Sequence, residues 1–275
     1  MVMRTLDIVK ADPAGNITVF VLGAEDMTPP ERTRAAKLLL ADRELRAEQA
    51  GFVTPPDGSG LWRLEMAGGE FCGNAARSLG LFAARRSGFS GRRAFFIETS
   101  GASRPVEVDV DCDTGEAAAA IEPPRRLAPL VFDGKQLAVY RFDGITHIIA
   151  PGTKADKAAF FAIKRLFEER YGTPDGAVGV MFYSAAEDIM RPAVYVYGTD
   201  TLVFESSCGS GSAAFACRIA ELDAGKTTVP VRQPGGTITA SVTVRDGEPG
   251  PIRIGGPVYL SELRFQLDLD RGAAD

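Results

Sequence analysis

The sequence has one histidine and only four cysteines. A Ser-His-Asp triad would have to use His147, and the chain contains no Gly-x-Ser-x-Gly nucleophile elbow. No two cysteines have the Cys-x-x-Cys spacing of structural zinc sites, so we expect no metal site. So few cysteines also argue against a disulfide-stapled secreted fold.

An excess of basic charge is also lacking. The chain carries 31 Lys and Arg against 36 Asp and Glu, a net charge of −5. This field, with no clustered basic stripe, would attract neither nucleic acid nor an anionic membrane. No stretch approaches the roughly 18 continuous apolar residues of a membrane helix, and no apolar run precedes the first charges as in a secretory signal. We therefore expect a soluble cytoplasmic protein whose partner is a small molecule.

The 275 residues, 45% of them hydrophobic, suffice for one large domain or two of ordinary size. Runs of branched and aromatic residues predict strands at 16–22, 94–100 and 104–111. Amphipathic spacing predicts helices at 29–45, which has proline in its first turn, and at 154–172. These elements predict an α/β (α+β) fold.

Two cysteines open similar segments. Cys72 and Cys208 are each followed by glycine, small polar residues and an alanine-rich run that is apolar almost all round, which predicts two buried helices. A strand–glycine–strand pattern follows each run. We predict two similar halves, residues 1–122 with a tail of about 262–275 and residues 123–261, each a curled, mostly antiparallel sheet around a central helix. The alternative is one mixed domain with two unrelated buried helices.

A thiol at a helix N-terminus lies beside free backbone N–H groups, which lower a cysteine pKa and bind carboxylates. Two such ends facing each other could hold one amino acid between two sulfurs. One thiolate would remove the α-proton, and the opposite thiol would return a proton to the other face. The N–H groups would stabilise the carbanion. Cys112 and Cys217 lack this context and are predicted to be core residues.

Four motifs carry a family resemblance. They are "DPAGNITVF" (12–20), "FCGNAAR" (71–77), "ESSCGSGSAA" (205–214) and "RQPGGTI" (232–238). Together they resemble the signatures of the cofactor-independent, two-cysteine amino-acid racemases of the diaminopimelate epimerase superfamily. The resemblance implies two pseudo-symmetric domains with the active site in the cleft between them. It also implies catalysis without pyridoxal phosphate, and no lysine has a recognisable context for that cofactor.

The resemblance implies a role for individual residues. Cys72 and Cys208 match the two acid/base cysteines. Asn16 matches an asparagine that lines the substrate site, and Glu205 matches an acidic residue that contacts the substrate amino group. The backbone donors that hold the α-carboxylate are matched by Gly73, Asn74, Gly209 and Ser210.

The determinants for a diaminopimelate side chain are missing. In diaminopimelate epimerases an arginine and several asparagines hold the distal carboxylate. Here Ser206 stands in place of the arginine, and Met66, Ile145 and Gly179 align with the asparagines. A desolvated carboxylate without donors would cost several kcal/mol. Diaminopimelate is therefore not the expected substrate.

The pattern is more similar to the histidine racemases of staphylopine-type metallophore pathways. It shares "Glu48-Gln49-x-Gly51-Phe52" with them. The Glu48 carboxylate could accept a hydrogen bond from an imidazole N–H, and its alternative role is that of a solvated loop residue. His147 is expected to be structural.

We therefore expect interconversion of L- and D-histidine. The alternatives are a diaminopimelate epimerase, a proline-type racemase, or a carboxylate-binding relative that performs no thiol chemistry. The oligomeric state is left open, a homodimer being the commonest arrangement.

Overall fold

The computed structural model describes residues 3–58, 60–174, 176–223, 226–245 and 248–268. The chain forms two compact units: unit 1 comprises residues 1–119 and 257–275, and unit 2 comprises residues 120–256. The sequence placed these boundaries at 122/123 and about 261/262. Residues 269–275 of the predicted tail lie outside the described residues.

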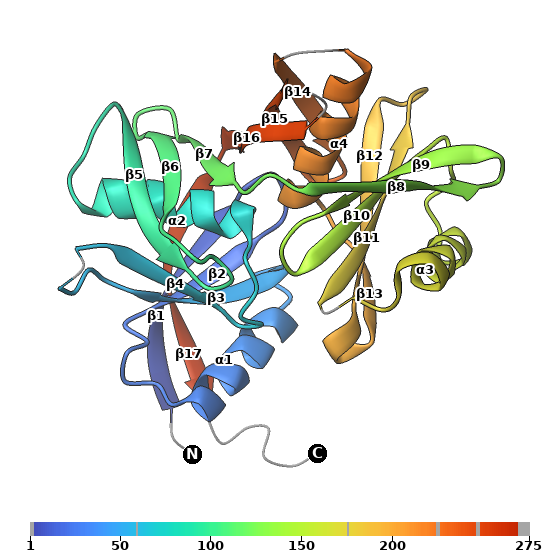
Figure 1. The fold of residues 1–275 in the computed structure, drawn as a ribbon. Coiled ribbons are helices and arrows are strands. Elements are labelled where there is room, and N and C mark those ends of the chain that lie inside the picture. Colours follow the sequence, from blue (N-terminus) through green and yellow to red (C-terminus); the bar gives the residue numbers. More distant parts are fainter. Residues whose placement is uncertain (1–2, 59, 175, 224–225, 246–247, 269–275) are drawn as a thin grey trace. The chain divides into compact units, whose positions relative to one another are not determined.

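The described part of unit 1 forms a sheet together with helices α1 and α2 (Figure 1). Its strands are hydrogen-bonded in the order β7-β6-β5-β4-β3-β2-β1-β17. Neighbours are antiparallel except for β2–β3 and β4–β5. Parallel neighbours need a crossover connection, and these two connections contain α1 and α2. The bounds are β1 (Met3–Asp12), β2 (Thr18–Leu22), α1 (Pro29–Ala41), β3 (Gln49–Thr54), β4 (Trp62–Met66), α2 (Gly73–Arg86), β5 (Arg92–Thr99), β6 (Val106–Asp111), β7 (Glu116–Ile121) and β17 (Tyr259–Asp268).

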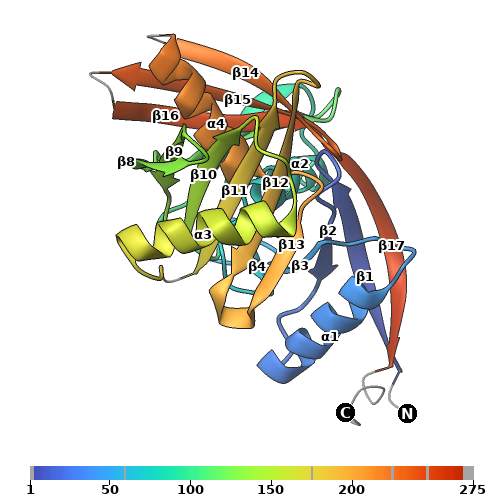
Figure 2. The ribbon, with the colours of Figure 1, turned by 90° about the vertical axis from the view of Figure 1, so that its right-hand side faces the viewer.

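Unit 2 has a six-stranded sheet in the order β13-β12-β11-β10-β9-β8, together with the antiparallel strands β14, β15 and β16. The parallel pair β10–β11 is connected through α3, which lies against β8 and β11 (Figure 2). The bounds are β8 (Arg125–Phe132), β9 (Lys135–Arg141), β10 (Ile145–Pro151), α3 (Lys157–Tyr171), β11 (Ala177–Ser184), β12 (Ile189–Val196), the 3₁₀ helix η1 (Tyr197–Thr199), β13 (Thr201–Phe204), α4 (Gly209–Leu222), β14 (Lys226–Gln233), β15 (Gly236–Arg245) and β16 (Glu248–Pro257).

The two units repeat one order of elements. Unit 1 reads β1-β2-α1-β3-β4-α2-β5-β6-β7, and unit 2 reads β9-β10-α3-β11-β12-α4-β14-β15-β16 with β13 inserted. The antiparallel, parallel and antiparallel pairings of β1 to β4 recur in β9 to β12. One outer strand completes each repeat, since β17 pairs with β1 and β8 pairs with β9. This order confirms the predicted pseudo-symmetric fold.

The central helices are buried as predicted. Every residue of α2 from Gly73 to Ala84 is buried, and the buried residues of α4 extend from Gly209 to Ala220. Helix α2 contacts β1, β4, β5 and β6, so the sheet of unit 1 curls around it. Helix α4 contacts β10, β11, β14 and β15.

The outer helices are shorter than predicted. Helix α1 ends at Ala41 because the Asp42 side chain accepts hydrogen bonds from the N–H groups of Glu44 and Leu45, which turn the chain away. Helix α3 begins after Asp156, whose carboxylate caps it by accepting from the Ala159 N–H at 2.9 Å. It ends at Tyr171, and the residue that follows, Gly172, has a φ of 75° that suits a helix C-terminus.

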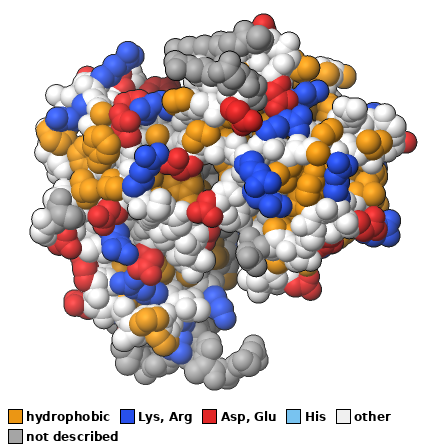
Figure 3. Space-filling model, in the orientation of Figure 1, with side chains coloured by type: hydrophobic (Ala, Val, Ile, Leu, Met, Phe, Trp, Pro, Cys, Tyr) orange, Lys and Arg blue, Asp and Glu red, His pale blue; other side chains and the backbone are white. Residues whose placement is uncertain are grey.

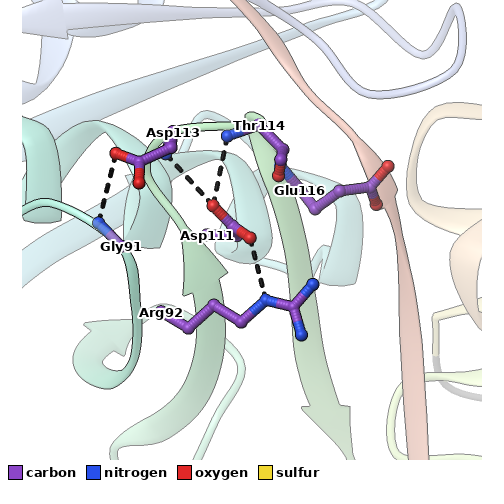
Figure 4. Close-up of polar contacts among 6 residues, drawn as sticks. All are labelled: Gly91, Arg92, Asp111, Asp113, Thr114 and Glu116. Carbon is purple, nitrogen blue, oxygen red and sulfur yellow. Dashed lines mark hydrogen bonds and ion pairs between the residues drawn. The ribbon is translucent and has the colours of Figure 1, made fainter.

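A charged turn closes the β6–β7 hairpin, whose strand β6 contacts α2 (Figure 4). Asp111 Oδ1 accepts from the N–H groups of Asp113 and Thr114 at 3.1 Å each, and Oδ2 accepts from Arg92 Nε at 2.9 Å. The bond from Arg92 and those from the turn lower the Asp111 pKa to about 2. The turn therefore keeps its carboxylate ionised and β6 in register with β7.

Charges of both signs are interspersed on the face shown in Figure 3. Among the residues that the structure describes, no helix is both long enough and apolar enough to cross a membrane.

We expect the packing of α2 against β6 to depend on Gly80. A Cβ at this position would lie 2.7 Å from Val108 Cβ and Cγ1. Gly80→Ala should lower the free energy of unfolding by about 1–3 kcal/mol through overpacking, which outweighs a gain of about 1 kcal/mol in helix propensity. Urea denaturation measures this difference.

Val108→Ala provides the control, because it removes the two methyl groups of Val108 and leaves only its Cβ near a Cβ at position 80. In that background Gly80→Ala should cost less stability than in the parent, and a double-mutant cycle would record this coupling. Stabilisation by Gly80→Ala in the parental background would show that the contact does not limit this position.

Candidate active site

Cys72 is the N-cap residue of α2, with extended backbone (φ −125°, ψ 109°). The half-buried sulfur accepts a hydrogen bond from the Ala75 N–H at 3.4 Å and donates one to Gln49 Oε1 at 3.0 Å. The same Gln49 oxygen accepts from Thr18 Oγ1 at 3.3 Å. Cys72 is thus held between a donor and an acceptor, which suits a group that alternates between thiolate and thiol.

Asn16 lies in the same unit and joins two other predicted site residues. Its Nδ2 donates to Glu48 Oε2 at 2.9 Å, and its Oδ1 accepts from Asn74 Nδ2 at 3.3 Å. Asn16 and Asn74 are buried, whereas Glu48 is exposed. Glu48 is exposed, as its alternative role of a solvated loop residue requires. The hydrogen bond from Asn16 nevertheless fixes one of its carboxylate oxygens.

Cys208 holds the corresponding N-cap position of α4, with φ −129° and ψ 116°. Its N–H donates to Gln233 Oε1 at 2.8 Å, and Gln233 Nε2 donates to Ser212 Oγ at 2.9 Å. The Ser212 hydroxyl donates in turn to the Cys208 carbonyl at 2.7 Å. This closed ring of bonds fixes the backbone on both sides of the sulfur.

The expected lowering of the thiol pKa is wrong for Cys208. The residue is only 7% exposed, and burial raises its pKa well above the ordinary value. The negative charge of Glu205 adds to the rise, while the Gly211 N–H and the Ser210 hydroxyl oppose it. The cost of desolvating a thiolate therefore exceeds the effect of the helix N-terminus, and Cys208 is a thiol at neutral pH.

His147 lies in β10 and is fully buried. Its Nε2 forms a 2.8 Å hydrogen bond with Ser210 Oγ, which lies 3.7 Å from Cys208 Sγ. Burial lowers the pKa of His147 to about 3, so the ring is neutral. The sequence predicts a structural role for His147. In the structure a single side chain, that of Ser210, lies between the His147 ring and the Cys208 sulfur.

Two of the three positions that align with the asparagines of diaminopimelate epimerases are apolar or filled. Met66 belongs to the core around α2. Gly179 pairs with His147 across β10 and β11, and any Cβ there would overlap His147 Nδ1. An asparagine therefore does not fit at position 179 while His147 keeps its place.

The remaining predicted residues lie where the motifs put them. Gly73 and Asn74 form the first turn of α2, and Gly209 and Ser210 form that of α4. Glu205 is half-buried three residues before Cys208, and its charge acts on that thiol.

Cys112 and Cys217 are core residues as predicted. Both are buried, Cys217 completely, and Cys112 belongs to the core of unit 1. Burial raises the pKa of Cys217 to about 12 and raises that of Cys112. Among the described residues, no group of three or more His, Cys, Asp or Glu is placed to hold a metal ion.

Sequence reasoning did not find four contributors. Gln49 and Gln233 bond to the two cysteines, Arg77 bonds to Asn74, and the Ser210 hydroxyl lies between His147 and Cys208. Both glutamines stand inside the motifs "EQAGF" and "RQPGG". Their partners lie on other elements, so local sequence could not reveal the contacts.

Comparison with known proteins shows a family for the chain. A sequence model of the family described as "Histidine racemase CntK N-terminal domain" matches residues 5–262. A histidine racemase of Fusobacterium nucleatum subsp. nucleatum is 32% identical over 237 residues, which cover 83% of this chain and 88% of that protein. A histidine racemase of Staphylococcus aureus is 26% identical over 246 residues, 86% of this chain and 88% of that protein.

The fold also has solved counterparts. The PhzF-family phenazine biosynthesis protein of Bacillus anthracis superposes with a TM-score of 0.69 at 16% identity, covering 98% of this chain and all of that one. At this identity the likeness establishes the shared fold alone. The family match over nearly the whole chain and the two helix-capping cysteines lead to one conclusion: this chain is an amino-acid racemase that belongs to the histidine racemase CntK family.

Proposed function

We propose that this chain interconverts L- and D-histidine with two cysteines and without a cofactor: one cysteine removes the α-proton, and the other gives its own proton to the opposite face. One observation carries the proposal: each unit places a cysteine at the N-cap of its buried central helix, in a member of the histidine racemase family. Each sulfur can serve as base in one direction and as acid in the other.

Racemisation takes two proton transfers. When Cys72 is the base, its thiolate takes the proton from the α-carbon and the C–H electron pair delocalises into the carboxylate. The Cys208 thiol then gives its proton to the opposite face of that carbon and becomes a thiolate. In the reverse direction Cys208 is the base and Cys72 the acid. The raised pKa of Cys208 suits the acid, because the thiol still holds its proton at neutral pH.

The helix N-termini supply charge stabilisation. The N–H groups of Gly73 and Asn74, with those of Gly209 and Ser210, are assigned to the α-carboxylate. They stabilise the negative charge that grows on its oxygens as the proton leaves. Glu205 is assigned to the ammonium group.

Glu48 is assigned to the imidazole. Its carboxylate can accept a hydrogen bond from a ring N–H, and the bond from Asn16 holds it in place. The apolar Met66 and the filled position at Gly179 support a substrate without a second carboxylate.

The two-base mechanism predicts a separation of exchange from inversion. Cys72→Ser and Cys208→Ser should each lower the racemisation rate of histidine by on the order of 10²–10⁴-fold, because one proton transfer is lost. Each variant should still exchange the α-proton of one enantiomer in D₂O, through the remaining thiol. Mass spectrometry with chiral chromatography measures both rates and shows which sulfur serves the L-enantiomer.

Cys217→Ala is the matched control, because Cys217 lies in α4, the helix that Cys208 caps, but is buried in the core. It should racemise histidine at the parental rate. Parental rates in both Cys72→Ser and Cys208→Ser would overturn the mechanism. A parent that binds histidine but exchanges no proton would be a carboxylate-binding relative instead.

Glu48→Gln should lower kcat/KM for histidine by roughly 10–100-fold, because a hydrogen bond to a charged group contributes about 1.5–3 kcal/mol. Glu44→Gln, at an exposed glutamate four residues upstream, should leave kcat/KM unchanged. Initial rates of D-histidine formation measure the difference. An equal loss in both variants, or in neither, would remove Glu48 from side-chain recognition.

Air oxidation should inactivate the enzyme, and reductant should restore it. Two sulfurs that act on opposite faces of one α-carbon can form a disulfide when the site is empty. Mass spectrometry should find a Cys72–Cys208 crosslink in the inactive protein and none in Cys208→Ser. We accordingly propose a reducing, cytoplasmic location. Oxidised, inactive protein without the crosslink would show that the two sulfurs do not face each other.

A further inference from the structure

Arg77 is a charged side chain fully buried inside unit 1. It lies in α2, one turn after the first-turn residue Asn74, and none of its surface is exposed. Burial lowers its pKa to about 10, an effect that the Cys72 sulfur opposes, so the guanidinium stays protonated at neutral pH. Buried charges are expensive and need partners of fixed geometry.

Two hydrogen bonds of the guanidinium bear on the site. Arg77 Nε donates to Asn74 Oδ1 at 3.1 Å, and Nη1 donates to the Pro257 carbonyl at 3.3 Å. An arginine can only donate hydrogen bonds. The oxygen of the Asn74 amide must therefore face Arg77, which turns its NH₂ group toward Asn16.

The direction set at Arg77 continues to Glu48. Asn74 Nδ2 donates to Asn16 Oδ1 at 3.3 Å, and Asn16 Nδ2 donates to Glu48 Oε2 at 2.9 Å. An amide can be rotated by 180° with little change of shape, so its orientation depends on its neighbours. Here a donor-only cation begins the chain of bonds and an acceptor-only carboxylate ends it. Both ends impose the same orientation on the two amides.

We propose that Arg77 is a positioning residue for substrate selection, which acts through Asn74 and Asn16 to hold the Glu48 carboxylate in one orientation. This inference rests on the proposed function, because Glu48 is the residue assigned to the imidazole. A carboxylate fixed before the substrate arrives loses less conformational freedom on binding, which favours side chains that offer it an N–H.

Arg77→Met tests the role, because it keeps a long buried side chain and removes every donor. The selectivity for histidine over a ring-N-methylated histidine, taken as a ratio of kcat/KM values, should fall by about tenfold, as expected for a lost charged hydrogen bond. Arg77→Lys should restore most of this selectivity, because it returns a cationic donor.

Arg85→Met is the matched control. Arg85 lies on the same helix and also donates to a backbone carbonyl, that of Cys112, at 3.0 and 2.7 Å. Its loss should lower stability without changing selectivity. An equal loss of selectivity in both variants would reduce Arg77 to a purely structural role.

A second readout does not depend on activity. The ¹H–¹⁵N signals of the Asn16 and Asn74 side-chain amides, assigned with Asn16→Asp and Asn74→Asp, should shift in Arg77→Met and stay in place in Arg85→Met. Unchanged signals in Arg77→Met would overturn the relay. Shifted signals with parental selectivity would overturn its role in substrate choice. A parent that does not racemise histidine would overturn the proposed function, and the amide signals would still decide the relay.

Asn74→Asp keeps the proposal testable if Arg77→Met does not fold. The new carboxylate can accept from Arg77 but cannot donate to Asn16. Asn16 would then turn its oxygen toward Glu48, where two acceptors meet. Selectivity should fall by at least as much as in Arg77→Met, and parental selectivity would contradict the proposal.

Discussion

The enclosure of an apolar helix by a curled sheet is the constraint on which the rest of the structure depends. Helix α2 is buried on every side from Gly73 to Ala84, so its position is fixed by contacts such as that of Gly80 with Val108. Helix α4 is continuously buried from Gly211 to Cys217, and Gly211 leaves no room for a Cβ beside Met181. A cysteine at each N-cap is therefore aimed by the core of its own unit.

The repeat makes the two sulfurs equivalent in position, but their surroundings differ. Cys72 is half-buried between the Ala75 N–H and Gln49. Cys208 is buried, and Glu205 raises its pKa further. The two substrates of an amino-acid racemase differ only in the configuration of the α-carbon and carry the same side chain. The difference between the two cysteine environments accords with the proposal that Glu48, in unit 1, recognises that side chain.

The polar groups of unit 1 are ordered by a buried cation. Arg77 orients Asn74, Asn74 orients Asn16, and Asn16 holds Glu48. Such a chain has only one arrangement that satisfies every member, because its two ends have opposite hydrogen-bonding character. The packing of α2 and the orientation of Glu48 are thus parts of one arrangement.

The sequence by itself determined the buried helices, the N-cap cysteines, the duplicated halves and the family, because each depends on local composition and spacing. It also predicted that Cys112 and Cys217 belong to the core. Only the tertiary structure decided the raised pKa of Cys208, the place of His147 beside Ser210, and the path from Arg77 to Glu48. These depend on desolvation and on contacts between residues as far apart as 63 positions, which no local pattern encodes.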